Sequence, residues 1–294
     1  MSKHTGIVGA GNMGGGMAKR LLSMGWSVHV HDKDSATQQA WQAAGAHGCA
    51  SPAAVAMAAD TVIVCVIDAV QVQEVLDGPD GLLAHLQAGQ TVIMCPTMAP
   101  EHTEDFARQL QAVGVHMVDA PMSGGPIRAA NGSMSLMLAA PAEVLAAQNE
   151  LLTTLSNQCV FISHKAGDGT RVKLVNNMLA GINLVGACEA MVLAEKLGLD
   201  KEITLNLIER SSGQNWIGSD RLRRVFAGDT SAGSHMRLLA KDTRLAVEAA
   251  QQAGYAGWLG AAAAEAFAMA CDQGMGVMDD SKMLEFIRHN TLLQ

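Results

Sequence analysis

The segment 5–32 constrains the fold of this chain more than any other. A short apolar strand at 5–8 leads into the turn Gly-Ala-Gly-Asn-Met-Gly at 9–14, and a helical pattern at 17–24 and a second strand at 27–31 follow. Glycines at this spacing between a strand and a helix permit a tight turn, close approach of the backbone to a pyrophosphate, and close packing of helix on strand. The segment therefore predicts an α/β Rossmann-type dinucleotide-binding domain.

The same segment indicates the cofactor. The N-terminus of the helix supplies N–H groups and the positive end of the helix dipole for phosphates. Asp32 follows the second strand, where an acidic residue accepts hydrogen bonds from the adenine ribose. Its carboxylate would repel a 2′-phosphate, which favours NAD, whereas the neighbouring Lys33 would partly offset that repulsion and leaves NADP open. In the turn, we expect the cofactor to be bound by Gly9, Gly11, Asn12, Met13 and Gly14.

Strands and helices continue to alternate up to about residue 165. The run 61–67 is apolar throughout, as a parallel strand needs when helices cover both faces of a sheet. We expect the ends of such strands, at Ile67-Asp68 and at Thr97, to lie at the carboxyl edge of the sheet, where open α/β sheets bind ligands. Further strands are expected at 91–95, 115–119, 133–138 and 158–162, with helices at 69–76, 101–113 and 141–154.

After residue 166 the strand patterns nearly disappear. Helical periodicity covers 171–197. We therefore expect two domains, a nucleotide-binding domain at 1–165 and an all-α domain at 166–294 for substrate binding and oligomerisation. No linker rich in Pro or Ser separates them, so the long helix is expected to join the halves. Further helices are expected at about 200–210, 234–253, 259–273 and 280–288.

Two polar groups suggest chemistry. Lys173 and Asn177 lie four residues apart in the long helix and therefore project from one face, which makes them a candidate catalytic pair. A solvated lysine and a surface amide are the common alternative for such a spacing. The turn Ser123-Gly124-Gly125 follows a strand and offers a hydroxyl and open backbone N–H groups to a small anion such as a carboxylate, although the same residues also form ordinary turns.

Composition excludes several classes of function. The net charge of −8 gives no basic footprint for nucleic acid or for a lipid anchor. The six cysteines are scattered singly and the histidines are dispersed, so we expect reduced structural thiols and no metal site. The segment 178–194 is strongly apolar, but Asn183 and Glu189 interrupt it, which favours a buried helix over a membrane span. The N-terminus enters a strand without a signal sequence, and we expect a soluble cytoplasmic protein.

Taken together, four motifs in this order make the chain resemble the β-hydroxyacid dehydrogenase family over essentially its whole length. Four motifs at matching spacing are far more specific than any one of them. They are the glycine turn with Met17-Ala18; Asp119-Ala120-Pro121-Met122-Ser123-Gly124-Gly125 through Gly132; Gly167-Asp168-Gly169 with Lys173 and Asn177; and Lys241-Asp242 in a late helix.

The resemblance implies hydride transfer between NAD(P) and the β-hydroxyl carbon of a small 3-hydroxy acid, of the 3-hydroxyisobutyrate, serine, threonate or glycerate type. Lys173 is implied as the general acid/base, a role that requires burial or a nearby cation to lower the pKa of the amine. A homodimer or homotetramer is implied by analogy. The implied contacts are Ser123, Gly124, Gly125, Asn177 and Asp242 for the substrate, and Thr97 and Lys241 for the cofactor.

Two other functions remain open from the sequence. Imine reductases and reductive aminases have an architecture similar to the one expected here, but they usually carry Asp or Tyr at the position of Lys173. The lysine therefore argues against an NADPH-dependent enzyme of that kind. A non-catalytic nucleotide-binding protein is a second alternative. The joint presence of Lys173, Asn177 and the Ser-Gly-Gly turn argues against it, because independent elements of one site agree.

Overall fold

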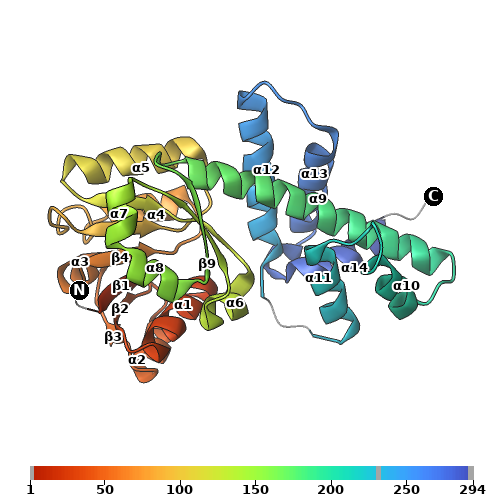
Figure 1. Cartoon of the computed structure of the whole chain (residues 1–294). Helices are drawn as coiled ribbons and strands as arrows, with labels where there is room; N and C mark the ends of the chain where they lie inside the picture. Colours follow the sequence, from red (N-terminus) through yellow and green to blue (C-terminus); the bar gives the residue numbers. More distant parts are fainter. Residues whose placement is uncertain (1–2, 230–232, 291–294) are drawn as a thin grey trace. The chain divides into compact units, whose positions relative to one another are not determined.

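The computed structural model describes residues 3–229 and 233–290. The chain divides into two compact units, Met1–Lys173 and Leu174–Gln294. Figure 1 traces the chain through both. The first unit holds the sheet, and the described part of the second unit is built from helices. This organisation confirms the predicted fold class, a Rossmann-type domain followed by a helical one.

A nine-stranded sheet forms the framework of the first unit, in the order β3-β2-β1-β4-β5-β6-β8-β7, with β9 paired to β8. The strands from β3 to β6 in this order are parallel, whereas β8 is antiparallel to β6 and β7 and parallel to β9. The chain order reverses between β1 and β4, the point at which such sheets bind ligands. The strands are β1 (His4–Val8), β2 (Ser27–His31), β3 (His47–Gly48), β4 (Thr61–Val64), β5 (Thr91–Met94), β6 (His116–Asp119), β7 (Met122–Ser123), β8 (Ser135–Ala139) and β9 (Gln158–Ser163).

The helices of the first unit cover both faces of this sheet. Several begin at short polar side chains: Asp34, Ser51 and Asp68 each accept a hydrogen bond from a backbone N–H in the first turn of the helix that follows. The helices are α1 (Asn12–Ser23), α2 (Ser35–Ala43), α3 (Pro52–Ala58), α4 (Ala69–Asp77), α5 (Pro100–Ala112), α6 (Gly125–Asn131), α7 (Ala142–Ala147) and α8 (Asn149–Leu155).

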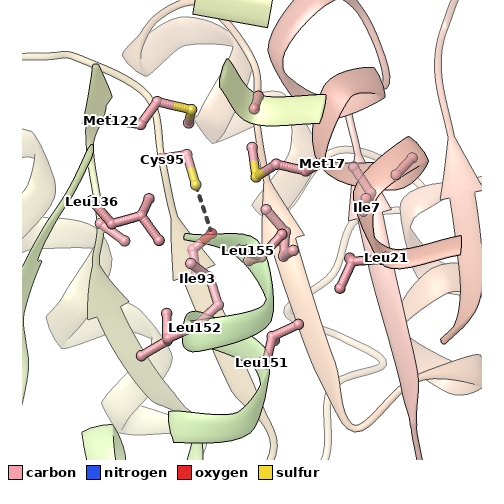
Figure 2. Packing of buried hydrophobic residues seen from close by; sticks show 14 of the residues in the cluster. Ile7, Met17, Leu21, Ile93, Cys95, Met122, Leu136, Leu151, Leu152 and Leu155 are labelled. Carbon is pink, nitrogen blue, oxygen red and sulfur yellow. Dashed lines mark hydrogen bonds between the residues drawn. The ribbon is translucent and has the colours of Figure 1, made fainter. Parts of the chain in front are cut away.

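Two apolar layers, one on each face of the sheet, account for the strand sequences. Successive side chains of a strand point to opposite faces, so Ile63 enters one layer while Val62 and Val64 enter the other. Because both faces are buried, Val62, Ile63 and Val64 are all apolar, and Thr61 at the start of the strand is the one buried polar residue in it. Figure 2 shows the first layer, in which leucines of α8 and residues of α1 pack on the strands. The labelled residues include Ile7, Met17, Leu21, Ile93, Leu151, Leu152 and Leu155.

The second unit consists of helices around its own core. α9 (Asp168–Lys196) begins in the first unit and continues into the second. Its buried residues Leu184, Cys188 and Met191 pack with Phe267 and Phe286 in one cluster. The remaining helices are α10 (Lys201–Ile208), α11 (Trp216–Phe226), α12 (Met236–Gln252), α13 (Trp258–Asp272), the short 3-10 helices η1 (Met275–Val277) and η2 (Asp280–Lys282), and α14 (Met283–Asn290).

α9 is exposed along one face. By length and composition it is long and apolar enough to cross a membrane, with 39% of its most apolar window buried. Val175, Leu179 and Leu193 are exposed, on the side opposite the buried cluster. The expected buried helix is therefore buried along one face only, and an apolar stripe remains on the other.

Some elements were missed or misplaced by the sequence patterns. The predicted start of the first helix at residue 17 is wrong, because α1 begins at Asn12 and contains three consecutive glycines. The predicted helix at 141–154 is two helices, separated at Gln148. α2, α6 and α11 were not predicted. α2 has no buried residue, so it lacks the apolar periodicity on which helix prediction depends.

Candidate active site

The glycine turn lies at the switch point of the sheet, between β1 and α1. Gly9 has φ +89°, and a Cβ there would lie 2.5 Å from the Cys65 carbonyl oxygen. A Cβ on Gly14 would lie 2.0 Å from the Gly9 carbonyl oxygen, so the helix can approach the turn only with glycine there. Gly11 has open space around it, and no side chain caps α1. The turn therefore presents an accessible backbone and an uncapped helix N-terminus, as a pyrophosphate requires.

Asp32 is fixed against this turn. Its Oδ2 accepts a hydrogen bond from the Ala10 backbone N–H at 2.7 Å, and its Oδ1 accepts one from the Asp34 N–H at 2.9 Å. These bonds hold the carboxylate beside the turn, and each oxygen has a second lone pair for a ligand hydroxyl. A groove of about 500 Å³ opens beside Gly11 and Asn12 and is also lined by α2 and α6. Met13 is partly buried against the core.

The other expected cofactor residues follow β4 and β5 at the same edge. Thr97 is partly exposed, and the Ile67 side chain is exposed. Asp68 has a local structural role, because its Oδ1 caps α4 by accepting from the Gln71 N–H at 3.0 Å. The Ile67 N–H donates to Gln71 Oε1 at 3.1 Å, which ties this strand end to α4.

The Ser-Gly-Gly segment is the junction between β7 and α6. Ser123 ends β7, opposite Ser135 of β8. Gly124 and Gly125 both have positive φ, +130° and +75°, a backbone conformation that other residues rarely adopt. A Cβ on Gly124 would also meet the Arg128 side chain at 3.0 Å. The two glycines are therefore required by the turn itself, whatever the turn binds.

Lys173 and Asn177 are both buried, with exposed fractions of 8% and 7%. They lie four residues apart on α9, so they occupy one face of it. Burial is unusual for a lysine without a specific role or partner. The common alternative, a solvated lysine and a surface amide, is therefore wrong.

Asn177 belongs to a polar cluster in the second unit. Its Nδ2 donates to Asp242 Oδ2 at 2.5 Å, and its Oδ1 accepts from Asn176 Nδ2 at 3.0 Å. Asp242, on α12, is 7% exposed, and its Oδ1 lies 2.7 Å from Lys241 Nζ. That contact is an ion pair without hydrogen-bond alignment, so Oδ1 is a buried acceptor with no hydrogen bond among the described residues.

Asp119 was quoted in a sequence motif but given no role. It ends β6, is 1% exposed, and accepts hydrogen bonds at the start of α9. The sequence feature that could have indicated its role is an acidic residue at the end of a buried strand.

The six cysteines are free thiols, and burial raises the pKa of Cys65 to about 12. Within the described ranges, no group of three or more His, Cys, Asp or Glu side chains is arranged to hold a metal ion.

Comparison with family models covers nearly the whole chain. Residues 4–163 match the NAD-binding domain of 6-phosphogluconate dehydrogenase. Residues 167–287 match the model described as NAD-binding of NADP-dependent 3-hydroxyisobutyrate dehydrogenase.

Individual relatives match over the same extent. L-threonate dehydrogenase of Cupriavidus necator is 34% identical over 97% of this chain and 96% of its own length. The structure of 3-hydroxyisobutyrate dehydrogenase from Salmonella typhimurium superposes with a TM-score of 0.89 at 30% identity, covering 96% of this chain and 99% of that one. The Mycobacterium tuberculosis 3-hydroxyisobutyrate dehydrogenase with L-serine gives a TM-score of 0.86 at 25% identity, over 98% and 100% of the two chains.

Proposed function

The chain belongs to the β-hydroxyacid dehydrogenase family and is an NAD(P)-dependent hydroxyacid dehydrogenase, and we propose that it oxidises the β-hydroxyl of a small 3-hydroxy acid with Lys173 as general acid/base. The observation that carries this proposal is the burial of Lys173 and Asn177 on one face of α9. A buried amine beside a buried amide is suited to handle a hydroxyl proton, because water does not compete for it.

When bound, a nicotinamide cofactor would supply the hydride acceptor for the substrate carbon. Lys173, as the neutral amine, accepts the proton of the β-hydroxyl, so that a carbonyl forms as the C–H bond breaks. In the reverse direction its ammonium returns that proton. Asn177 orients the hydroxyl, since its Nδ2 is held by Asp242 and its direction is thereby fixed.

For the substrate, we propose Ser123, Gly124 and Gly125 as the carboxylate site. Glycines carry no side chain that could cover their own backbone N–H groups, and both have positive φ at this turn. We propose Asp242 as a further substrate contact, because its buried Oδ1 is ion-paired with Lys241 but accepts no hydrogen bond among the described residues, so a substrate hydroxyl can donate to it.

For the cofactor, we propose binding by the turn and by the strand ends of the first unit, with NAD preferred to NADP. The open space at Gly11, the uncapped α1 and the fixed carboxylate of Asp32 support this assignment. Functionally we assign 1–165 to the cofactor, apart from the substrate segment Ser123-Gly124-Gly125, and 166–294 to substrate and oligomerisation, apart from the cofactor contact Lys241. The proposed cofactor residues are Gly9, Gly11, Asn12, Met13, Gly14, Asp32, Ile67, Asp68, Thr97 and Lys241.

The cofactor assignment predicts that Asp32→Ala raises the KM for NAD by about tenfold to 100-fold, since a charge-assisted hydrogen bond contributes about 1.5–3 kcal/mol. The KM for NADP should change less, because repulsion of the 2′-phosphate is lost together with the ribose contact. Steady-state KM values for both cofactors measure this. Asp80→Ala, at an exposed carboxylate, is the matched control. An unchanged KM for NAD in Asp32→Ala would remove the assignment.

We also propose that the protein is a soluble cytoplasmic homodimer or homotetramer. Val175, Leu179 and Leu193 are exposed apolar residues on one face of α9, and Leu197 directly after the helix is also exposed. Such a stripe is stabilised when a second copy covers it. Light scattering on the purified chain is expected to give a mass of two or four copies, and Leu179→Glu is expected to shift it toward one. A monomeric wild type would contradict this proposal.

The proposed reaction is tested by an absorbance screen for reduced nicotinamide. L-Threonate, 3-hydroxyisobutyrate, L-serine and glycerate are offered with NAD and separately with NADP. At least one acid is expected to be oxidised, faster with NAD. Lactate has a carboxylate but no β-hydroxyl and is expected to be inert. Oxidation of none of the four with either cofactor would overturn the proposed substrate class.

A further inference from the structure

The residue that precedes the helix carrying Lys173 has no side chain with which to cap it. The Gly167 carbonyl accepts a hydrogen bond from the Arg171 N–H at 2.9 Å, which makes Gly167 the residue before the first helical turn. Its φ of +94° suits glycine, but glycine has no side chain to accept the free N–H groups of that turn. The acceptor must therefore come from elsewhere in the chain.

Asp119 supplies it from the end of β6. Its Oδ2 accepts from the Gly167 N–H at 2.9 Å and from the Thr170 N–H at 3.1 Å, and its Oδ1 accepts from the Thr170 hydroxyl at 2.9 Å. Thr170 stands three residues after Gly167, where the side chain of an N-cap residue would bind. A carboxylate distant in the sequence thus takes the place of an N-cap side chain.

The surroundings leave this carboxylate little freedom. A Cβ on Gly169 would lie 3.0 Å from Asp119 Oδ2 and 2.9 Å from the Met137 carbonyl oxygen, so glycine makes room for the contact. The Thr170 hydroxyl is also 3.0 Å from the Thr103 hydroxyl of α5. The first turn of α9 is therefore fixed to both the sheet and α5.

We propose that Asp119 is the positioning residue for Lys173. Lys173 lies three residues beyond Thr170, in the next turn, so the placement of its backbone follows from that of the capped turn. This inference rests on the proposed catalytic role of Lys173. It assigns to Asp119 no contact with substrate or cofactor.

Protonation of Asp119 leaves the cap in place. Burial raises the pKa of Asp119 to about 6, against hydrogen bonds from Thr170 and Gly167 that lower it. When Asp119 is protonated on Oδ1, it donates to the Thr170 hydroxyl, which in turn donates to the Thr103 hydroxyl. When Asp119 is ionised, the Thr103 hydroxyl donates to the Thr170 hydroxyl, which donates to Oδ1. Oδ2 accepts the two backbone N–H groups in both states. An asparagine can make the same bonds as the protonated acid.

The groups facing Asp119 give the sign of its pH dependence. The buried Cys95 thiol, directly after β5, interacts with it electrostatically, while Arg171 of α9 forms ion pairs with both Glu104 of α5 and Asp168. Because the pKa of Asp119 is raised on folding from 3.8, the contribution of Asp119 to stability is greatest below pH 3.8 and is lost as pH rises toward about 6. The difference in Tm between Asp119→Asn and wild type should therefore increase in favour of the variant as pH rises from 3.8 to about 6, and should stay constant at higher pH.

The test compares Asp119→Ala and Asp119→Asn in the full chain. Asp119→Ala is expected to lower kcat by about tenfold to 100-fold, because small misplacement of a catalytic group is costly, with KM for NAD within about twofold. Asp119→Asn is expected to stay within about threefold of wild type. The pH at which kcat is half-maximal should shift in Asp119→Ala only. Thr170→Val, which keeps the backbone bonds, should fall between the two, and Thr170→Ser should match wild type.

Wild-type kcat in folded Asp119→Ala would overturn the inference, as would an equal loss in Asp119→Asn, which would assign the effect to charge. If Asp119→Ala does not fold, Thr170→Val with a wild-type kcat and pH profile would overturn it. Lys173→Met separates the two proposals: full activity there rejects the catalytic role of Lys173, whereas an inactive Lys173→Met beside a fully active Asp119→Ala rejects only the positioning role.

Discussion

Lys173→Met is expected to lower kcat for hydroxy-acid oxidation by about 100-fold or more, because a positioned general acid/base contributes about 10²–10⁴-fold. Methionine fills much of the space of the buried lysine stem but cannot take a proton. Binding of reduced nicotinamide, followed by fluorescence, should remain near the wild-type value. Stopped-flow measurement of a single turnover checks that the loss lies in the chemical step.

Lys165→Met is the matched control for that substitution. Lys165 lies on the segment before α9, and its side chain is 67% exposed, beside Glu104. Its replacement is expected to leave kcat within about twofold, as surface ion pairs contribute little. Near-normal turnover in Lys173→Met, with the cofactor bound, would show that another group moves the proton.

Asp242→Ala is expected to lower kcat/KM by about tenfold to 100-fold. Truncation leaves the Asn177 amide and the Lys241 ammonium without their shared carboxylate, and a buried polar group without its partner costs about 1–3 kcal/mol. Asp242→Asn retains one acceptor for Asn177 but no charge for Lys241. Steady-state kinetics on the best substrate from the screen distinguish the two losses.

If Asp242→Asn is as active as wild type while Asp242→Ala is impaired, the hydrogen bond to Asn177 is the important contact. If both variants are equally impaired, the ion pair with Lys241 is the important contact. Wild-type kcat/KM in both variants would contradict a role for Asp242 in the site.

The local sequence was enough to predict the Rossmann-type domain. The residues that identify this domain lie within one βαβ unit. In that unit a Cβ at Gly9 or Gly14 would clash with the backbone, so only glycine fits at either position. The apolar strands could be predicted for a similar reason, since burial on both faces makes most of their positions apolar. The start of α1 could not, because glycines at 14–16 oppose helix on propensity alone and are allowed by packing against neighbouring helices.

The hydrogen bonds made by Asn177 and by the first turn of α9 could not be predicted. The Asn177–Asp242 bond joins residues 65 positions apart, and Asp119 reaches the Thr170 N–H across 51. No spacing rule links such pairs, because each depends on how helices and strands pack. Lys173 and Asn177 could be paired in advance only because both lie on one helix, where the spacing fixes the geometry.

The most direct test of the account is a crystal structure of the chain with NAD and the acid that the screen identifies. It should place Lys173 Nζ within about 3.2 Å of the β-hydroxyl oxygen, the reach of a general base. The same hydroxyl carbon should face the nicotinamide ring. A β-hydroxyl bound away from Lys173, with its proton directed to a different side chain, would contradict the central claim.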